Sequence, residues 1–139
     1  MTWYDWYISV WDKLVTLAKT ITDFEENVYY GEKFPPDKYP SCYICPLPIS
    51  VTPASMMLSS NDAQFEFGVV VHNPDVKEGN LQAFNYVGQI YDLLVADRSL
   101  GGSVCNLEIL QVIPDWRGLG KGLENHWVGL RIKLTKIRA

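Results

Sequence analysis

Two segments of this chain alternate apolar and polar side chains with a period of two, and this pattern limits the folds open to it. The first runs from Phe65 to His72 and the second from His126 to Thr135. In the first segment, one side carries Phe65, Phe67, Val69 and Val71. In the second segment, one side carries His126, Val128, Leu130, Ile132 and Leu134. Successive residues of a strand point to opposite faces, so each segment predicts a strand with one apolar face. The fold must therefore contain a sheet with a covered face.

Two other segments follow the helical period, with apolar residues recurring at three- and four-residue steps. The first is expected as a helix from about Thr2 to Thr20, with Thr2 as its N-cap. Its expected apolar face consists of Trp3, Tyr7, Val10, Trp11, Leu14, Leu17, Ala18 and Ile21. The second is expected from about Gly79 to Ala96, before two glycines that supply a left-handed exit. Its expected apolar face consists of Leu81, Phe84, Val87, Gly88, Tyr91, Leu94 and Val95.

Three further strands complete the expected elements: Asn27–Tyr30, Cys42–Val51 and Val104–Ile113. Pro46 and Pro48 cannot both donate to a ladder, so Cys42–Val51 is expected at a sheet edge. Because helices and strands are segregated along the chain, we expect an α+β fold. It would hold a mixed, mostly antiparallel sheet of four to five strands, with two helices packed on one face. The length fits a single domain, residues 1–139.

The composition excludes several classes of protein. With 47% apolar and 20% charged residues, the chain is typical of globular proteins and unlike disordered ones. No long uncharged apolar run is present, so no membrane span is expected. Asp5 and Asp12 interrupt the stretch where a signal peptide would be apolar. The chain has only three cysteines, a poor basis for a disulfide framework. Together with the unlikeness of its start to a signal peptide, this predicts a protein made in a reducing cytoplasm.

The charge is unevenly distributed. The net charge of −4 argues against nucleic-acid binding over the whole surface. From Arg117 to the end, however, the chain carries +5, and the part before it carries −9. Such a chain can attract copies of itself head to tail, so Arg117, Lys121, Arg131 and Lys133 are candidate interface residues. Alternatively, these basic residues only solvate the outer face of the last strand.

Motifs for catalysis or cofactors are weak. Cys42 and Cys45 have the spacing of zinc and redox sites, but in a strand they would face opposite sides. The glycine-rich segment Gly118–Gly122 lacks the Ser or Thr that follows the lysine of a phosphate loop. His72 and His126 lack a clear companion serine. We therefore expect no enzyme, no cofactor and no metal; a small ligand- or metal-binding enzyme domain is the alternative from a different class.

Aromatic residues are concentrated in the first eleven positions. Trp and Tyr are enriched at interface hot spots. Trp3, Tyr7 and Trp11 follow the helical period and are expected in the core. Tyr4 and Trp6 lie off that face, so they are the candidate interface residues of this helix.

The second half of the chain carries a longer pattern. A helix ending in Ile90–Val104 (sequence IYDLLVADRSLGGSV) leads into a strand, a glycine-rich loop and the strand His126–Leu134. This order, with D-x-x-L-G-G-x-V between helix and strand, resembles the tail-terminator (tail-completion) proteins of long-tailed bacteriophages. The amphipathic N-terminal helix and the proline-containing strand near Pro46 are similar to that family's first half.

The resemblance implies a non-catalytic structural protein of the virion. Subunits of this family form a ring, commonly a hexamer, at the head-proximal end of the tail tube. The ring ends tube polymerisation and joins the tail to the head. The implied partners are further copies of the chain, the tail tube protein, the head–tail connector protein and, in passing, DNA in the lumen. Assembly would occur in the host cytoplasm. A head–tail connector or neck protein is the closest alternative.

Overall fold

The structure, a computed structural model, describes residues 2–33, 35–48, 62–114 and 124–136. Its elements are α1 (Trp3–Lys19), the 3₁₀ turn η1 (Thr22–Phe24), β1 (Val28–Tyr30), β2 (Ser41–Pro46), β3 (Asp62–His72), α3 (Val76–Ala96), β4 (Val104–Ile113) and β5 (Asn125–Lys136). The strands form one sheet in the order β1-β2-β3-β5-β4. Only β1 and β2 are parallel. The expected α+β fold with a mixed, mostly antiparallel sheet is confirmed.

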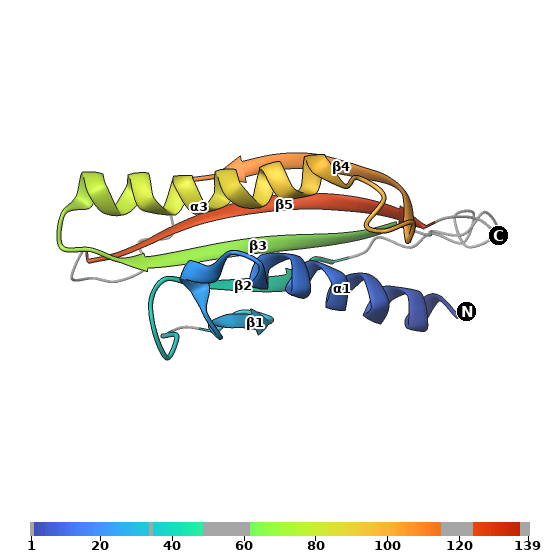
Figure 1. Ribbon diagram of the computed structural model, residues 1–139, viewed down its shortest axis with the longest axis horizontal. Helices are drawn as coiled ribbons and strands as arrows, with labels where there is room; N and C mark the ends of the chain where they lie inside the picture. Colours follow the sequence, from blue (N-terminus) through green and yellow to red (C-terminus); the bar gives the residue numbers. More distant parts are fainter. Residues whose placement is uncertain (1, 34, 49–61, 115–123, 137–139) are drawn as a thin grey trace.

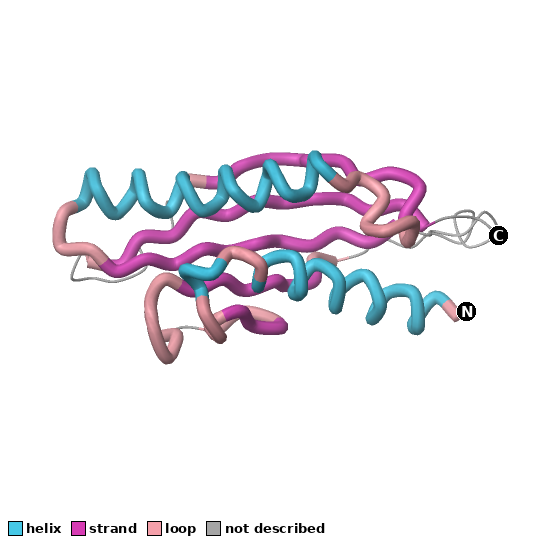
Figure 2. The backbone as a smooth tube through the Cα atoms, in the orientation of Figure 1, coloured by secondary structure: helices cyan, strands magenta, loops and turns pink. Residues whose placement is uncertain are grey.

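Both helices lie on the same face of the sheet (Figure 1). α1 packs over β1 and β2, whereas α3 packs over β3 and β5. The main core lies between these two layers and receives side chains from both helices and all five strands. Figure 2 shows both helices in front of the sheet, with long strands visible between them. No helix in the described ranges is long and apolar enough to cross a membrane.

α1 begins after Thr2, the N-cap that the sequence predicts, because Thr2 and Asp5 form a reciprocal capping box. The Asp5 amide donates to the Thr2 hydroxyl at 3.1 Å, and the Thr2 amide donates to the Asp5 carboxylate at 3.3 Å. The buried face includes the expected Val10, Leu14 and Ala18, and also Trp6 and Val15, which were not expected there. Trp3 is 38% exposed, so its assignment to the core is wrong. Tyr7 and Trp11 are partly buried and pack against the core.

α3 spans Val76–Ala96 and is capped by Asp75, whose carboxylate accepts from the Glu78 amide at 3.0 Å. Its buried residues are Gly79, Ala83, Val87, Ile90 and Leu94. Small residues face the sheet at the start of the helix: a Cβ on Gly79 would lie 2.0 Å from the His126 ring. The expected apolar face is therefore wrong except at Val87 and Leu94. The true face is displaced by one residue, about 100° around the helix.

β2 is not an edge strand, which corrects the expectation from its prolines. β1 pairs with its first half, through Val28↔Cys42 to Tyr30↔Ile44. β1 then ends, and the Gly31 amide makes the last bond to the Ile44 carbonyl at 2.9 Å. Amides alternate sides along a strand, so the nitrogen of Pro46 points past the end of β1. The proline therefore removes no bond from this ladder.

Candidate functional site: two exposed apolar surfaces

The face of α3 that was expected in the core lies on the surface. Its exposed fractions are 53% for Leu81, 40% for Phe84, 42% for Tyr91 and 38% for Val95. Residues at these three- and four-residue steps form one continuous stripe along the helix. The stripe therefore presents large apolar side chains to solvent over most of the length of α3.

The stripe lies on the flank of α3 that faces away from α1. Tyr86 marks the flank near α1, because its hydroxyl donates to the Asp23 carboxylate at 2.9 Å. Phe84 and Tyr91 lie about 150° around the helix from Tyr86. Because α3 rests on β5 and β3, the stripe faces the side of the sheet that ends in β4.

β4 extends this surface. Val112 pairs with Leu130 of the main core, so both lie on the helix-covered face of the sheet. α3 leaves β4 partly uncovered, and Val112 is 44% exposed. We call the combined surface the α3–β4 patch; it consists of Leu81, Phe84, Tyr91, Val95 and Val112.

Gly88 sits in the middle of the stripe, between Phe84 and Tyr91. A Cβ at this position would meet nothing within 4 Å. A glycine inside a helix costs roughly 0.5–1 kcal/mol relative to alanine. Within the described part of the chain, no close neighbour accounts for this glycine.

A second apolar surface lies at the opposite edge of the sheet, beside β1. Trp11 packs against Tyr30, the last residue of β1, with ring centroids 5.5 Å apart. The Tyr30 hydroxyl donates to the Asp12 carboxylate at 2.7 Å, which ties this edge to α1. Tyr4 lies two turns before Trp11 on the same flank of the helix.

Ring contacts run along this edge from Trp3 to Tyr30 through the partly buried Tyr7 and Trp11. Trp3 contacts Tyr7 at 4.8 Å between centroids, and Tyr7 contacts Trp11 at 6.4 Å. Tyr4 is 67% exposed, Tyr30 54% and Trp3 38%. We call Trp3, Tyr4, Trp11 and Tyr30 the aromatic edge. Of the expected interface residues, Tyr4 thus lies on an exposed surface.

Trp6 does not, and its expected interface role is wrong. It is 3% exposed, and its indole nitrogen donates to the Ser103 carbonyl at 2.9 Å. The side chain therefore fastens α1 to the turn before β4. Tryptophan spacing along the helix could not distinguish Trp3 from Trp6, because the apolar stripe of α1 is wide enough to include either.

Arg131 and Lys133 pair within the chain. The Arg131 Nε donates to the Glu66 carboxylate at 2.9 Å, and Glu66 is buried. The Lys133 ammonium lies 3.4 Å from the Asp62 carboxylate, where both side chains are partly exposed. These partners come from β3, the antiparallel neighbour of β5. The basic charge expected to meet another subunit is thus partly balanced inside the fold. Arg117 and Lys121 lie outside the described residues, as does the glycine-rich segment.

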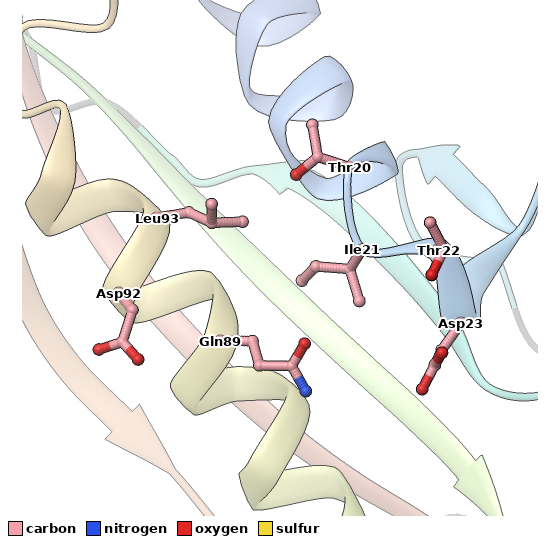
Figure 3. Close-up of a pocket in the computed structure, with 7 residues that line it drawn as sticks. All are labelled: Thr20, Ile21, Thr22, Asp23, Gln89, Asp92 and Leu93. Carbon is pink, nitrogen blue, oxygen red and sulfur yellow. The ribbon is translucent and has the colours of Figure 1, made fainter.

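A groove separates the two helices on their outer side. One hollow of about 420 Å³ is lined by Thr20, Ile21 and Asp23 near the end of α1 and by Gln89, Asp92 and Leu93 of α3 (Figure 3). A second, of about 410 Å³, includes Lys13 and Asp97. The hydroxyl of Tyr86 holds η1 to α3 through its hydrogen bond to Asp23. Partial burial is the larger cause, and this hydrogen bond the second, that raises the pKa of Tyr86 to about 12. The hydroxyl therefore stays protonated.

The cysteines and histidines are dispersed. Cys42 faces the main core and Cys45 packs on the opposite face, so the expected separation of the two thiols is confirmed. Burial raises the pKa of the Cys42 thiol far above its ordinary value. The His126 Nε2 lies 3.0 Å from the Asn73 carbonyl, and the His72 Nδ1 lies 2.9 Å from the Asn125 side-chain oxygen. Across the described ranges, no three His, Cys, Asp or Glu side chains gather as metal ligands.

Comparison with known proteins adds no family. No protein-family model matches the sequence, and no curated protein is significantly similar to it. The α3–β4 patch and the aromatic edge are therefore the features of this chain that indicate a function. The α3–β4 patch was not predicted from the sequence. The signal was nevertheless present, because α3 carries two interleaved apolar stripes and only one of them can face the sheet.

Proposed function

We propose that this protein is a structural subunit that assembles head to tail into a ring at the head-proximal end of a phage tail tube. The ring would end tube polymerisation and present the surface that joins the tail to the head. The observation that carries this proposal is the pair of dissimilar apolar surfaces at opposite edges of the sheet. Exposed patches of this kind mark sites of protein association.

The dissimilarity of the two surfaces favours a ring. A two-fold dimer uses the same patch on both subunits, whereas a ring uses two different patches on every subunit. Here one patch combines a face of α3 with part of β4 and is mostly aliphatic, and the other is built from tryptophan and tyrosine. A subunit with one of each can bind a neighbour on both sides.

The placement at a tail tube rests on the resemblance of the second half of the chain. The turn that carries D-x-x-L-G-G-x-V is closely bonded. The Gly101 amide donates to the Asp97 carboxylate at 2.9 Å, and the Val104 amide donates to the Ser99 carbonyl at 3.1 Å. Gly101 and Gly102 have positive φ, as does Leu100. These glycines therefore serve the backbone geometry of the turn.

Tail tubes of the virus that encodes the chain provide the test. We expect the purified protein to bind one end of isolated tubes, seen by negative-stain imaging, and to stop their elongation by added tube protein. Binding to purified head connector rings before any tube is present would indicate a connector role instead. Tubes that stay uncapped and elongate normally would contradict the proposal.

A further inference from the structure

We propose that the aromatic edge of one copy packs against the α3–β4 patch of the next copy, so that α1 of one subunit lies beside α3 of its neighbour. This inference rests on the proposed self-assembly and adds the contact by which it occurs. The occupant of the α3–β4 patch is thus a second copy of this chain.

The sizes of the two surfaces match each other and match what an interface needs. Taking roughly 150–250 Å² for a complete large side chain, the exposed fractions give on the order of 400 Å² for the α3–β4 patch and 300 Å² for Trp3, Tyr4 and Tyr30 of the aromatic edge. A standard interface buries about 800 Å² per partner, of which a little over half is apolar. Each surface therefore supplies most of the apolar part of one side of such an interface.

The arrangement of elements allows this contact to repeat. Across the helix layer, each copy presents α1 and then α3, and across the sheet it presents β1 through to β4 (Figure 1). Joining the β4 edge of one copy to the β1 edge of the next continues the order of both layers. The same contact then serves every copy, which is the condition for a ring.

Gly88 provides an independent argument for close approach by a helix. The stripe residues Leu81, Phe84, Gly88, Tyr91 and Val95 follow three- and four-residue steps, the spacing at which one helix packs along another. A glycine in the middle of that stripe lets a neighbouring backbone or ring approach where a side chain would stand. The ring of Tyr4, which is 67% exposed, is the side chain that we assign to this space.

A mixing experiment tests the contact. One variant, Phe84→Glu with Tyr91→Glu, places two charges in the α3–β4 patch; the other, Trp3→Glu with Tyr4→Glu, places two charges in the aromatic edge. All four side chains are exposed, so both variants should fold. We expect each variant alone to be monomeric by analytical ultracentrifugation. An equal mixture should form a 1:1 dimer, because one intact surface remains on each partner.

Other outcomes overturn the inference in distinguishable ways. If either variant alone self-associates, or the mixture stays monomeric up to about 0.5 mM, the proposed contact is wrong. If unmodified protein forms a ring and both variants still do, only the contact fails and the proposed function stands. If unmodified protein does not self-associate, with or without tail tubes, both fail. Gln82→Glu, on the other flank of α3, is the matched control and should assemble normally.

Gly88→Gln separates an interface role from a purely structural one. In the monomeric Trp3→Glu, Tyr4→Glu background, it should raise the melting temperature by about 3 °C, because glutamine favours the helix more than glycine does. In the otherwise unmodified chain, it should weaken assembly by about tenfold or more, since the added side chain fills the contact. A more stable monomer with unchanged assembly would contradict the assignment.

Discussion

Gly68 and Gly129 lie opposite each other in the register of β3 and β5, on the sheet face away from the helices. Their missing side chains leave room for two rings: Tyr43 lies over Gly68, and Trp127 lies over Gly129. The Trp127 indole donates to the Tyr43 hydroxyl at 2.8 Å, and that hydroxyl donates to the buried Glu66 carboxylate at 3.2 Å. These glycines thus serve packing and are unlike Gly88.

Gly68→Ala tests that distinction. The added Cβ would lie 2.1 Å from the Tyr43 ring, so the ring must move and its hydrogen bonds must adjust. We expect a loss of about 1–3 kcal/mol in the free energy of unfolding, measured with urea in the monomeric Trp3→Glu, Tyr4→Glu background. Gly88→Ala in the same background should gain about 0.5–1 kcal/mol. Equal effects of the two substitutions would contradict this reading.

Among the elements, β3 and β5 are joined by two ion pairs of different burial. The Glu66 side chain is 4% exposed beside Arg131, whereas Asp62 and Lys133 are 43% and 37% exposed. A charged hydrogen bond to a buried carboxylate contributes more to stability than a pair in solvent. Reversing Arg131 to Glu would therefore disturb the fold, and it cannot serve as a test of assembly.

The two pairs make a matched comparison on one strand. Arg131→Ala should lower the free energy of unfolding by about 1.5–3 kcal/mol, because Glu66 loses its guanidinium partner. Lys133→Ala should lower it by about 0–1 kcal/mol. Urea unfolding of each variant at low salt measures both. A small effect for Arg131→Ala, equal to that for Lys133→Ala, would show that burial of the pair is unimportant.

The elements themselves were largely predictable from sequence, because they depend on local patterns. The capped start of α1 and the alternating faces of β3 and β5 are each encoded within a few neighbouring residues. The faces on which the helices pack were less predictable. α3 carries two apolar stripes one residue apart, and only tertiary contact with β5 decides between them. The internal position of β2 depends on a parallel partner, and the Arg131–Glu66 pair depends on register between distant strands.

For the whole molecule, the structure changes the physical basis of the proposed self-association. Charge asymmetry along the sequence predicted attraction between unlike ends. The fold places Arg131 and Lys133 against acidic partners of β3 and exposes apolar surfaces at the two edges of the sheet. The proposed contact is therefore mainly apolar, with charge in a lesser role. An apolar contact is weakened little by moderate salt, in contrast to one formed by exposed charges.

The mass of the purified protein in solution, measured by light scattering coupled to size exclusion, tests self-assembly directly. We predict one discrete species at a fixed multiple of the 15.8 kDa chain, unchanged over a tenfold range of concentration and by moderate salt. A monomer at every concentration, even with tail tubes added, would contradict self-assembly. A mass that keeps growing with concentration would contradict a closed ring.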